Sequence, residues 1–374
     1  MKLRVLGNVV RNALIKTEIL VNRYMKREFI PVDLGIFHIE TSSTCNLKCR
    51  FCAYEKKSSP KVNMPNEMFF DCVEQATSLG YDRFELTPCT GDVFMDKHVF
   101  EKFGFLDAHP NVMSYQFFTN LTVPGSDELK KLADSKKLAN LTISIYGHDE
   151  ESFIAITKST PQVYQRLISN LETLLALLGH LRFSVAIGFR STFDVPKNDS
   201  SELMALISQF KKAGVAVRPS HGVYNNWGGY ISQEDVSGLN IHITSTELSH
   251  KSGACVRLFD SIQVMSTGVV NACACRDVDA TLKIGDIKEM PLNKIIAIKN
   301  AEYMRIINEQ QADNFRPVCK SCDFYKSIYH QRSGYRRNNV PTQTLHEFLD
   351  NARNKCSTDI VQQHSTERTG AYRP

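Results

Sequence analysis

TSSTCNLKCRFC, residues 41–52, follows a short apolar run at residues 35–40. This stretch places Cys45, Cys49 and Cys52 at CxxxCxxC spacing within one predicted loop. Thiolates are the usual protein ligands of iron–sulfur clusters, and three of them can bind three irons of a four-iron cube. The fourth iron then keeps an open coordination position for a small molecule. Zinc is the alternative, but structural zinc usually takes four ligands from CxxC pairs, so the spacing favours iron–sulfur.

The chain has 11 cysteines among 374 residues, and most of them fall into two groups. The second group consists of Cys255, Cys273, Cys275, Cys319 and Cys322, whereas Cys72, Cys89 and Cys356 are scattered. The N-terminus lacks the pattern of a secretory signal, and no run approaches the roughly 18 apolar residues that span a bilayer. We therefore expect a cytoplasmic protein, in which thiols stay reduced and clustered cysteines bind metal.

Apolar strands alternate with helical segments after residue 35. The candidate strands are residues 35–40, 83–87, 114–119, 140–145, 182–189 and 215–218, with helices predicted at 66–79, 99–106, 126–133, 162–178 and 201–213. Repeated strand–helix units predict a parallel sheet covered by helices. Six units are too few for a closed eight-stranded barrel. We therefore predict an α/β fold, a partial (β/α)6 TIM-like barrel with its functional residues at the C-terminal ends of the strands.

The pattern divides the chain into four parts. We expect a basic amphipathic helix over residues 1–34, the barrel over 35–240, a small cysteine-rich domain over 241–335 and a polar basic tail over 336–374. The helix is expected to pack on the barrel, and weak contact with an anionic membrane surface is the alternative. The net charge of +5 is mild, and no nucleic-acid-binding motif accompanies it. We therefore expect no nucleic-acid partner.

The first cysteine stretch resembles the signature of the radical S-adenosylmethionine (SAM) superfamily, CxxxCxΦC, in which Φ is aromatic and is Phe51 here. Gly91-Asp92, after the second strand, is similar to the Gly-Gly-Glu motif with which that family binds the SAM amino group. The resemblance covers roughly residues 36–230. This chain departs from the family in having Asp92 in place of Glu and Val93 in place of Pro.

Three further strand ends carry residues that the resemblance assigns to the cofactor. Asn120 follows the third strand, where the family often has Thr-Asn-Gly, and Ser144 lies where a Ser-Ile/Leu-Asp-Gly segment is common. Arg190 ends the fifth strand and is expected to meet the SAM carboxylate. Each of these residues could also belong to an ordinary turn or surface. Their shared position at strand ends supports the cofactor-binding role.

The second cysteine group contains Cys255, then Gly268 five residues before Cys273, and a CxxC pair at Cys319 and Cys322. Four thiolates complete a cluster without an open position. The pattern resembles the auxiliary-cluster domains called SPASM, in their shorter one-cluster form called twitch. A structural zinc site made by the same four cysteines is the alternative.

Cys275 is an additional member of that group. It is a spare buried thiol, a substitute ligand or a catalytic hydrogen donor to a substrate radical. Cys89 lies beside the turn that contains Gly91 and could face the active site. The segment Asn225-Asn226-Trp227, after the sixth strand, either lines a polar pocket or forms an ordinary loop.

The resemblance implies an enzyme with a SAM-binding [4Fe–4S] cluster, an auxiliary [4Fe–4S] cluster, SAM, and a flavodoxin- or ferredoxin-type electron donor. Such enzymes form a 5′-deoxyadenosyl radical that takes a hydrogen atom from an unactivated C–H bond. Residues 1–34 are too few for the peptide-recognition domain of many peptide-modifying members. We therefore predict an oxidoreductase, a dehydrogenase or epimerase, of a carbohydrate-like substrate: a sugar, nucleotide sugar or cyclitol. The alternatives are a peptide maturase and a non-catalytic zinc-binding regulatory protein.

Overall fold

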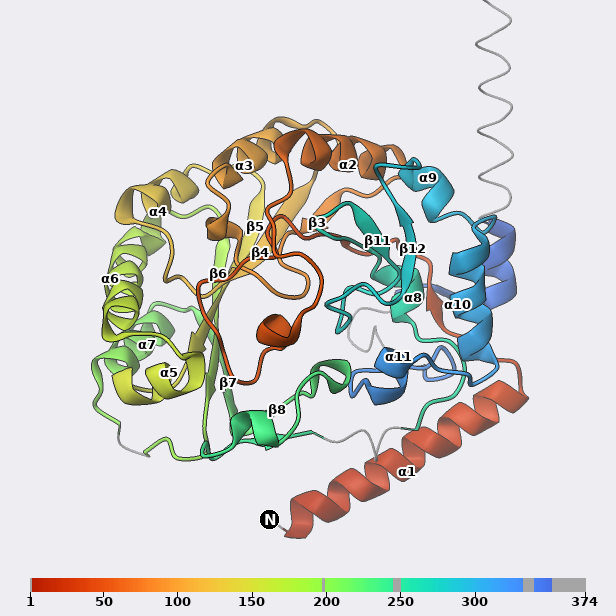
Figure 1. Ribbon diagram of the computed structural model, residues 1–374. Helices are drawn as coiled ribbons and strands as arrows, with labels where there is room; N and C mark the ends of the chain where they lie inside the picture. Colours follow the sequence, from red (N-terminus) through yellow and green to blue (C-terminus); the bar gives the residue numbers. More distant parts are fainter. Residues whose placement is uncertain (1, 197–198, 245–249, 332–339, 352–374) are drawn as a thin grey trace, which may run out of the picture.

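The computed structural model describes residues 2–196, 199–244, 250–331 and 340–351 of the chain. A curved nine-stranded sheet, in the order β12-β11-β10-β2-β3-β4-β5-β6-β7, runs through its centre (Figure 1). All six predicted strands are present and pair in parallel as neighbours. They are β2 (Phe37–Ile39), β3 (Arg83–Glu85), β4 (Ser114–Thr119), β5 (Leu138–Tyr146), β6 (Ser184–Ser191) and β7 (Ala216–His221). The predicted partial barrel is confirmed.

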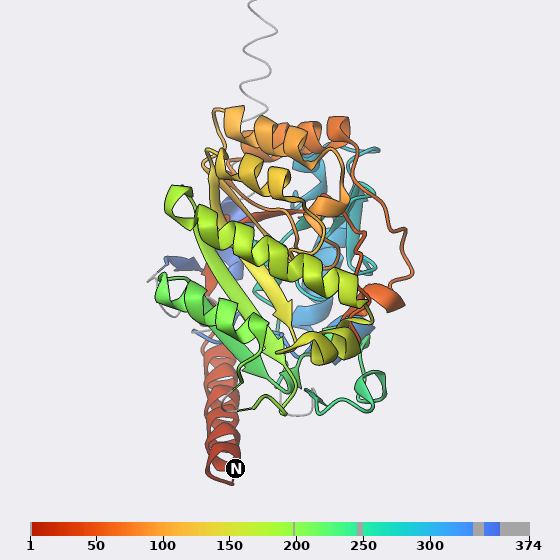
Figure 2. The same ribbon diagram turned by 90° about the vertical axis from the view of Figure 1, so that its left-hand side faces the viewer.

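Helices cover the convex face of this sheet (Figures 1 and 2). They are α2 (Asn66–Ser78), α3 (Val99–Ala108), α4 (Ser126–Ala133), α5 (Glu150–Thr157), α6 (Pro161–Leu177) and α7 (Glu202–Lys212). Local sequence explains several starts: Asp149 and Ser152 form a capping box at α5, Ser201 caps α7, and Pro161 occupies the first turn of α6. The sequence analysis did not predict α5, which packs against the end of β5 and supports the cysteine loop.

The C-terminal part of the chain extends the same sheet. Strand β10 (Gln263–Val264) pairs in parallel with β2, and β11 (Val269–Asn271) and β12 (Lys283–Asp286) follow in antiparallel order. The helices of this part are α8 (Arg257–Asp260), α9 (Leu292–Ile295), α10 (Ala301–Gln311) and α11 (Pro317–Ser321). Because β10 lies beside β2, the second cysteine group is brought to the edge of the barrel that carries the first.

Segments from both ends of the chain meet outside the barrel. Helix α1 (Lys2–Tyr24) is followed by β1 (Ile30–Pro31), which pairs with β13 (Thr342–Gln343). Residues 345–351 are helical, and the ring of Phe348 lies 5.0 Å from that of Phe259. Residues 340–351 of the predicted tail are therefore folded, whereas 336–339 and 352–374, with Cys356, lie outside the described residues. In the described part of the chain, no helix is long and apolar enough to cross a membrane.

The remaining elements are short. One pair of strands joins β8 (Val223–Tyr224) to β9 (His242–Ile243). The 3-10 turns are η1 (Ala53–Lys56), η2 (Val93–Met95), η3 (Leu178–His180), η4 (Trp227–Gly229) and η5 (Glu234–Val236). Stacked aromatic rings of Phe103, Tyr115 and Phe117 fill the space between α3 and β4. This buried packing holds the strand ends, and the loops that follow them, in place.

Candidate active site between two cysteine groups

The first cysteine loop connects the end of β2 to η1 and is held from two sides. Backbone N–H groups of Lys48 and Arg50 donate to the last carbonyls of α5, with N···O distances of 3.0 Å to Thr157 and to Ile156. The ring of Phe51 is buried, and its centroid lies 5.0 Å from that of Tyr146 on β5. Phe51 therefore anchors the cysteine loop by packing inside the barrel, and its ring is buried.

The three thiols of this loop fit the ligand set of an iron–sulfur cluster. Burial raises the pKa of Cys45 to about 12 and that of Cys52 to about 11, and the charges of Cys45 and Cys52 add to the effect of burial in raising the pKa of Cys49. Such thiols keep their protons unless a cation replaces them. The N–H of Leu47 donates to Cys45 Sγ at 3.5 Å, a contact that would stabilise a thiolate ligand.

Gly91 and Asp92 lie directly beneath the cysteine loop. Gly91 has a φ of 100°, and a Cβ atom there would lie 2.2 Å from the carbonyl oxygen of Ser42, so only glycine fits. The carboxylate of Asp92 is buried, and burial raises its pKa. It accepts hydrogen bonds from Thr119 Oγ1 at 2.9 Å and from the N–H of Asn120 at 2.8 Å. In this structure Asp92 therefore fixes the turn that follows β4.

The other predicted cofactor residues surround the same loop. Asn120 donates to Asn46 Oδ1 at 3.0 Å and approaches Cys45 Sγ at 3.8 Å. Ser144 lies two residues before the end of β5, half-buried, in register with Gly188. Burial raises the pKa of Cys49, whereas the positive charge of Arg190 acts in the opposite direction. The guanidinium of Arg190, at the end of β6, thus lies near the thiols and could bind the carboxylate of a ligand there.

The second cysteine group gathers from three segments: the start of α8, the loop after β11, and α11. Burial raises the pKa of Cys319 and of Cys322 to about 12 and that of Cys255 to about 11. The charges of Cys255, Cys275, Cys319 and Cys322 all raise the pKa of Cys273 further, so these four thiols lie near enough to act on Cys273 electrostatically. In the described part of the chain, no three His, Cys, Asp or Glu side chains are positioned to hold a single metal ion.

Several sulfurs of this group accept hydrogen bonds, as cluster ligands do. The N–H of Phe324 donates to Cys322 Sγ at 3.2 Å, and Gln310 Nε2 donates to Cys319 Sγ at 3.2 Å. The N–H of Lys326 approaches Cys255 Sγ at 3.5 Å. The donor chemistry of this set fits an auxiliary iron–sulfur cluster, with Cys275 present beyond the four sulfurs that a cluster needs.

Comparison with known families agrees with this geometry. A model described as the radical SAM superfamily matches residues 39–192, and a model described as an iron–sulfur cluster-binding domain, SPASM, matches residues 255–323. The chain belongs to the radical SAM superfamily. Its two domains indicate a SAM-binding [4Fe–4S] cluster, an auxiliary [4Fe–4S] cluster and SAM as cofactors. No curated protein sequence matches the chain.

Three solved structures with a similar arrangement are distant from this chain in sequence. BtrN in complex with AdoMet and 2-DOIA is 13% identical, covers 80% of this chain and 97% of its own, and has a TM-score of 0.49. Streptococcus suis SuiB bound to S-adenosylmethionine is 14% identical over 78% of this chain and 70% of its own, with a TM-score of 0.49. Native anSMEcpe with bound AdoMet is 14% identical over 79% and 94%, with a TM-score of 0.45.

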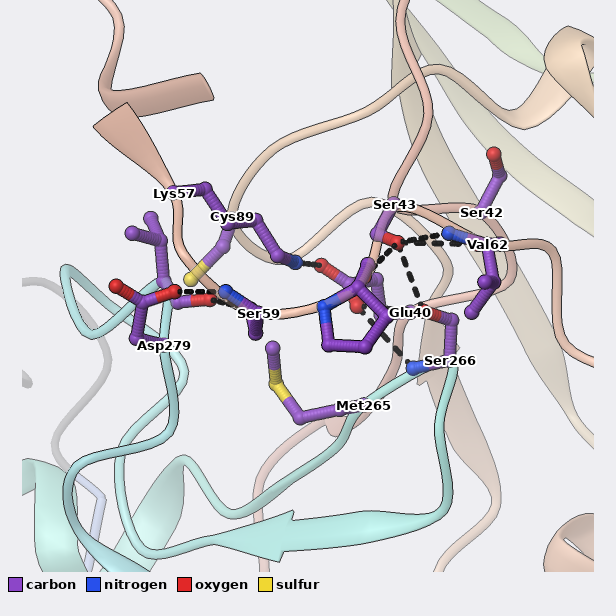
Figure 3. Close-up of polar contacts among 12 residues, drawn as sticks. Glu40, Ser42, Ser43, Lys57, Ser59, Val62, Cys89, Met265, Ser266 and Asp279 are labelled. Atoms are coloured by element: carbon purple, nitrogen blue, oxygen red, sulfur yellow. Dashed lines mark hydrogen bonds and ion pairs between the residues drawn. The ribbon is translucent and has the colours of Figure 1, made fainter. Parts of the chain in front are cut away.

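A buried ion pair inside the radical SAM domain orients a carboxylate that binds the SPASM domain (Figure 3). Lys57 Nζ lies 3.2 Å from Glu40 Oε1, and both side chains are at most 1% exposed. The second carboxylate oxygen of Glu40 accepts from the N–H of Ser266 at 3.1 Å and from its hydroxyl at 3.0 Å. Ser266 belongs to the β10–β11 hairpin, and its hydroxyl oxygen also lies 3.0 Å from that of Ser43 in the cysteine loop. Glu40 thus connects both domains to the start of the cysteine loop.

The loop after β8 has a docking role in this radical SAM protein. The N–H of Asn226 donates to Asp323 Oδ2 at 3.0 Å, and its side-chain amide donates to the carbonyl of Ser321 at 2.8 Å. Asn225 closes a local turn by accepting from the N–H of Trp227. Asn226 therefore holds η4 against the CxxC segment of the SPASM domain, and Asn225 supports the turn beside it.

Three residues that the sequence analysis did not single out occupy the space between the domains: Glu40, Lys57 and Arg276. Cys89 lies there as well, with its Sγ 3.5 Å from Gln263 Oε1 and 3.5 Å from the carbonyl of Ala274. The available signals were weak, an acid at the end of the first strand and an arginine directly after Cys275. Neither signal is informative until β10 is known to lie beside β2.

Proposed function

We propose that this radical SAM protein is an oxidoreductase of a carbohydrate-like small molecule, a sugar, nucleotide sugar or cyclitol, that it oxidises or epimerises at a hydroxyl-bearing carbon. When bound, the clusters and SAM supply a 5′-deoxyadenosyl radical and an electron acceptor. One observation carries the proposal: both cysteine groups lie within electrostatic reach of one side chain, that of Arg276. Arg276 influences both Cys52 and Cys275 electrostatically, and Cys275 in turn influences Cys89. A substrate held there would lie between the two clusters.

The residues of the radical SAM domain would orient SAM. Arg190 would bind its carboxylate, and Asn120 and Ser144 would contact the cofactor from neighbouring strand ends. Gly91 lets the turn after β3 approach the start of the cysteine loop at Ser42. The ring of Phe51 lies 4.5 Å from that of Tyr224, centroid to centroid, and would exclude water from the space beneath the cysteine loop. The cluster ligands proposed are Cys45, Cys49 and Cys52 in the first domain, and Cys255, Cys273, Cys319 and Cys322 in the second.

Cys275 is the proposed catalytic residue for epimerisation. Burial raises the pKa of its thiol, so its S–H hydrogen is retained at neutral pH and can be transferred to a substrate radical. Oxidation does not need such a donor, because the substrate radical then loses an electron and a proton. We therefore expect Cys275→Ala to abolish epimerisation and to leave oxidation in place. The proposed electron donor is a flavodoxin or ferredoxin of the cytoplasm.

Iron content and EPR on anaerobically reconstituted protein test the two-cluster assignment. We expect about eight irons in the wild type and about four in a Cys45→Ala/Cys49→Ala/Cys52→Ala variant, with the SAM-sensitive EPR signal lost. A triple variant without iron would remove the auxiliary cluster from the proposal. A colourless protein that holds zinc in both sites would instead support the non-catalytic alternative.

The substrate class is tested by following 5′-deoxyadenosine with reduced protein and SAM. Sugars, nucleotide sugars and cyclitols form one set of candidates, and peptides encoded near the gene form the other. We expect a member of the first set to stimulate formation of 5′-deoxyadenosine. Its product should have lost two hydrogen atoms or should be inverted at one carbon. Turnover of a peptide alone would replace this function by peptide maturation.

A further inference from the structure

The guanidinium of Arg276 is fixed in the space between the two cysteine groups. Its central carbon lies 5.1 Å from the ring centroid of Trp227 and 4.9 Å from that of Phe324, so the group is held between two aromatic rings. Its Nη1 donates to the carbonyl oxygen of Cys275 at 2.7 Å. Stacking and this hydrogen bond leave the guanidinium little rotational freedom.

The opposite edge of the same guanidinium, formed by Nε and Nη2, has no partner among the described residues. Nε is buried and makes no hydrogen bond within the described part of the chain. A buried N–H without an acceptor costs free energy, and an arginine edge with two parallel N–H groups matches a carboxylate or phosphate. The unfilled edge therefore points to a bound oxyanion.

Nearby carboxylates do not supply that oxyanion. Asp279 accepts from the backbone N–H groups of Ser58 and Ser59, at 2.9 and 2.8 Å. Asp323 accepts from the N–H of Asn226 through Oδ2, and its Oδ1 is buried without a hydrogen bond among the described residues but forms no ion pair with Arg276. No ion pair between Arg276 and any carboxylate is found in the described part of the chain, whereas Arg316 pairs with two glutamates there.

We propose that Arg276 binds an oxyanion carried by the substrate, a carboxylate or a phosphate. This inference rests on the proposed function, because it places the substrate in the space between the clusters. It narrows the carbohydrate-like class to anionic members, namely sugar phosphates, nucleotide sugars or uronic acids. Arg276 would hold the anionic end of the substrate near Cys275 and Cys89.

Calorimetric binding to the anaerobic holoprotein with SAM tests this proposal. The probes are glucose 6-phosphate, glucuronate and glucose, which share a carbon skeleton and differ in charge. Trp227 is the chain's one tryptophan and lies against Arg276, so its fluorescence reports binding at this place. We expect at least one anionic probe to bind about tenfold or more tightly than glucose. Preference for the phosphate or for the carboxylate distinguishes the two sources of the oxyanion.

Two variants assign the effect to Arg276. Arg276→Gln should abolish the preference, and Arg276→Lys should keep part of it, because lysine keeps the charge but loses the two-pronged edge. Arg305→Gln, at a side chain 61% exposed, is the matched control and should bind like the wild type. Equal binding of all three probes by the wild type, or an unchanged preference in Arg276→Gln, would overturn the proposal.

SAM affinity and iron content are measured on the same samples. If both are normal and no anion preference exists, this inference fails while the proposed function stands. If the wild type lacks iron or does not bind SAM, the proposed function fails, and the anion preference is still read independently.

A separate observation concerns α1, which extends beyond the edge of the rest of the chain (Figures 1 and 2). Its exposed side carries an apolar stripe, Val10, Leu14, Val21 and Tyr24, with exposed fractions of 51–88%. The opposite side faces the protein through buried Ile19 and through Asn22, which donates to the carbonyl of Tyr329. Large apolar side chains aligned in this way need a partner.

Charge identifies that partner. Both acids of residues 1–28 contact the rest of the chain: Glu18 accepts from the N–H of Gln331, and Glu28 from the N–H of Leu345. Exposed Arg11 and Lys16 flank the stripe. We propose that α1 rests on an anionic membrane surface, with the stripe in the headgroup region and the cations on lipid phosphates.

Vesicle flotation tests this surface. We expect the full-length holoprotein to float with vesicles of phosphatidylcholine and phosphatidylglycerol, and less with phosphatidylcholine alone. Leu14→Asp should reduce the bound fraction several-fold, whereas Met113→Asp, an equally exposed apolar site elsewhere, should not. Absence of binding would overturn the proposal, as would a dimer in solution that Leu14→Asp dissociates, since a second copy would then cover the stripe.

Discussion

Replacing Lys57 by methionine tests whether the buried ion pair stabilises Glu40, whose carboxylate binds Ser266 of the SPASM domain. The change removes the ammonium and keeps a side chain of similar shape. Glu40 then remains buried, with its Oε2 still bound to Ser266 but with no counter-charge at Oε1. Removing one partner of a buried pair typically costs about 3–5 kcal/mol, because the other charge stays uncompensated. We expect a loss of that size in the free energy of unfolding.

A double-mutant cycle separates the pair from its surroundings. Glu40→Gln alone should also destabilise the protein, because it leaves Lys57 buried and unpaired. The double variant restores neutrality and keeps an amide oxygen for Ser266, so it should recover at least about 2 kcal/mol relative to the sum of the single changes. Lys56→Met is the matched control, since its pair with Asp235 lies at the surface, and should cost about 1 kcal/mol or less.

Urea unfolding of anaerobic samples, followed by far-UV circular dichroism, measures these free energies. Retained iron, determined on the same samples, shows whether the cysteine loop follows the pair. The reasoning is refuted if Lys57→Met costs no more than Lys56→Met, or if the double variant equals the sum of the two single variants. Either result would mean that the Glu40–Lys57 contact adds nothing to the junction.

Three further changes have defined outcomes. Gly91→Ala should lower the free energy of unfolding by about 1–3 kcal/mol because of its positive φ, and by more because the new Cβ would overlap Ser42. It should also weaken SAM binding, measured by calorimetry. Unchanged stability would contradict the close approach of Gly91 to Ser42. Burial raises the pKa of Glu85 to about 7 from 4.5, so the native state holds the proton more tightly than the unfolded state. The contribution of Glu85 to stability should therefore be fully present below pH 4.5 and fall by about 3 kcal/mol as the pH rises to 7. Glu85→Gln should remove this contribution from the difference in stability between pH 5 and pH 8, measured by urea unfolding, and an unchanged difference would exclude Glu85 as its cause. Phe51→Ala should cost about 3–5 kcal/mol in the same assay, whereas exposed Phe118→Ala should cost little; equal losses would show that Phe51 does not anchor the loop.

The sequence alone determined the features that depend on neighbours along the chain. The CxxxCxxC spacing lies within eight residues, and the strand–helix alternation repeats over short windows, so both are readable without coordinates. They were sufficient to predict the partial barrel, the two cysteine groups and the radical SAM family. The glycine at position 91 was also visible as part of a motif, although the reason for it, contact with Ser42, was not.

Only the tertiary structure decided how the two domains meet. The pairing of β10 with β2 joins residues more than two hundred positions apart, and no local pattern encodes which edge of a sheet a late strand will occupy. That pairing creates the Glu40–Lys57–Ser266 junction and places Arg276 between the cysteine groups. Charged side chains are common in any sequence, but burial gives a few of them energetic weight, because in a low-dielectric interior each charge requires a partner. Within the described part of the chain, the buried Nε of Arg276 has no hydrogen-bond partner.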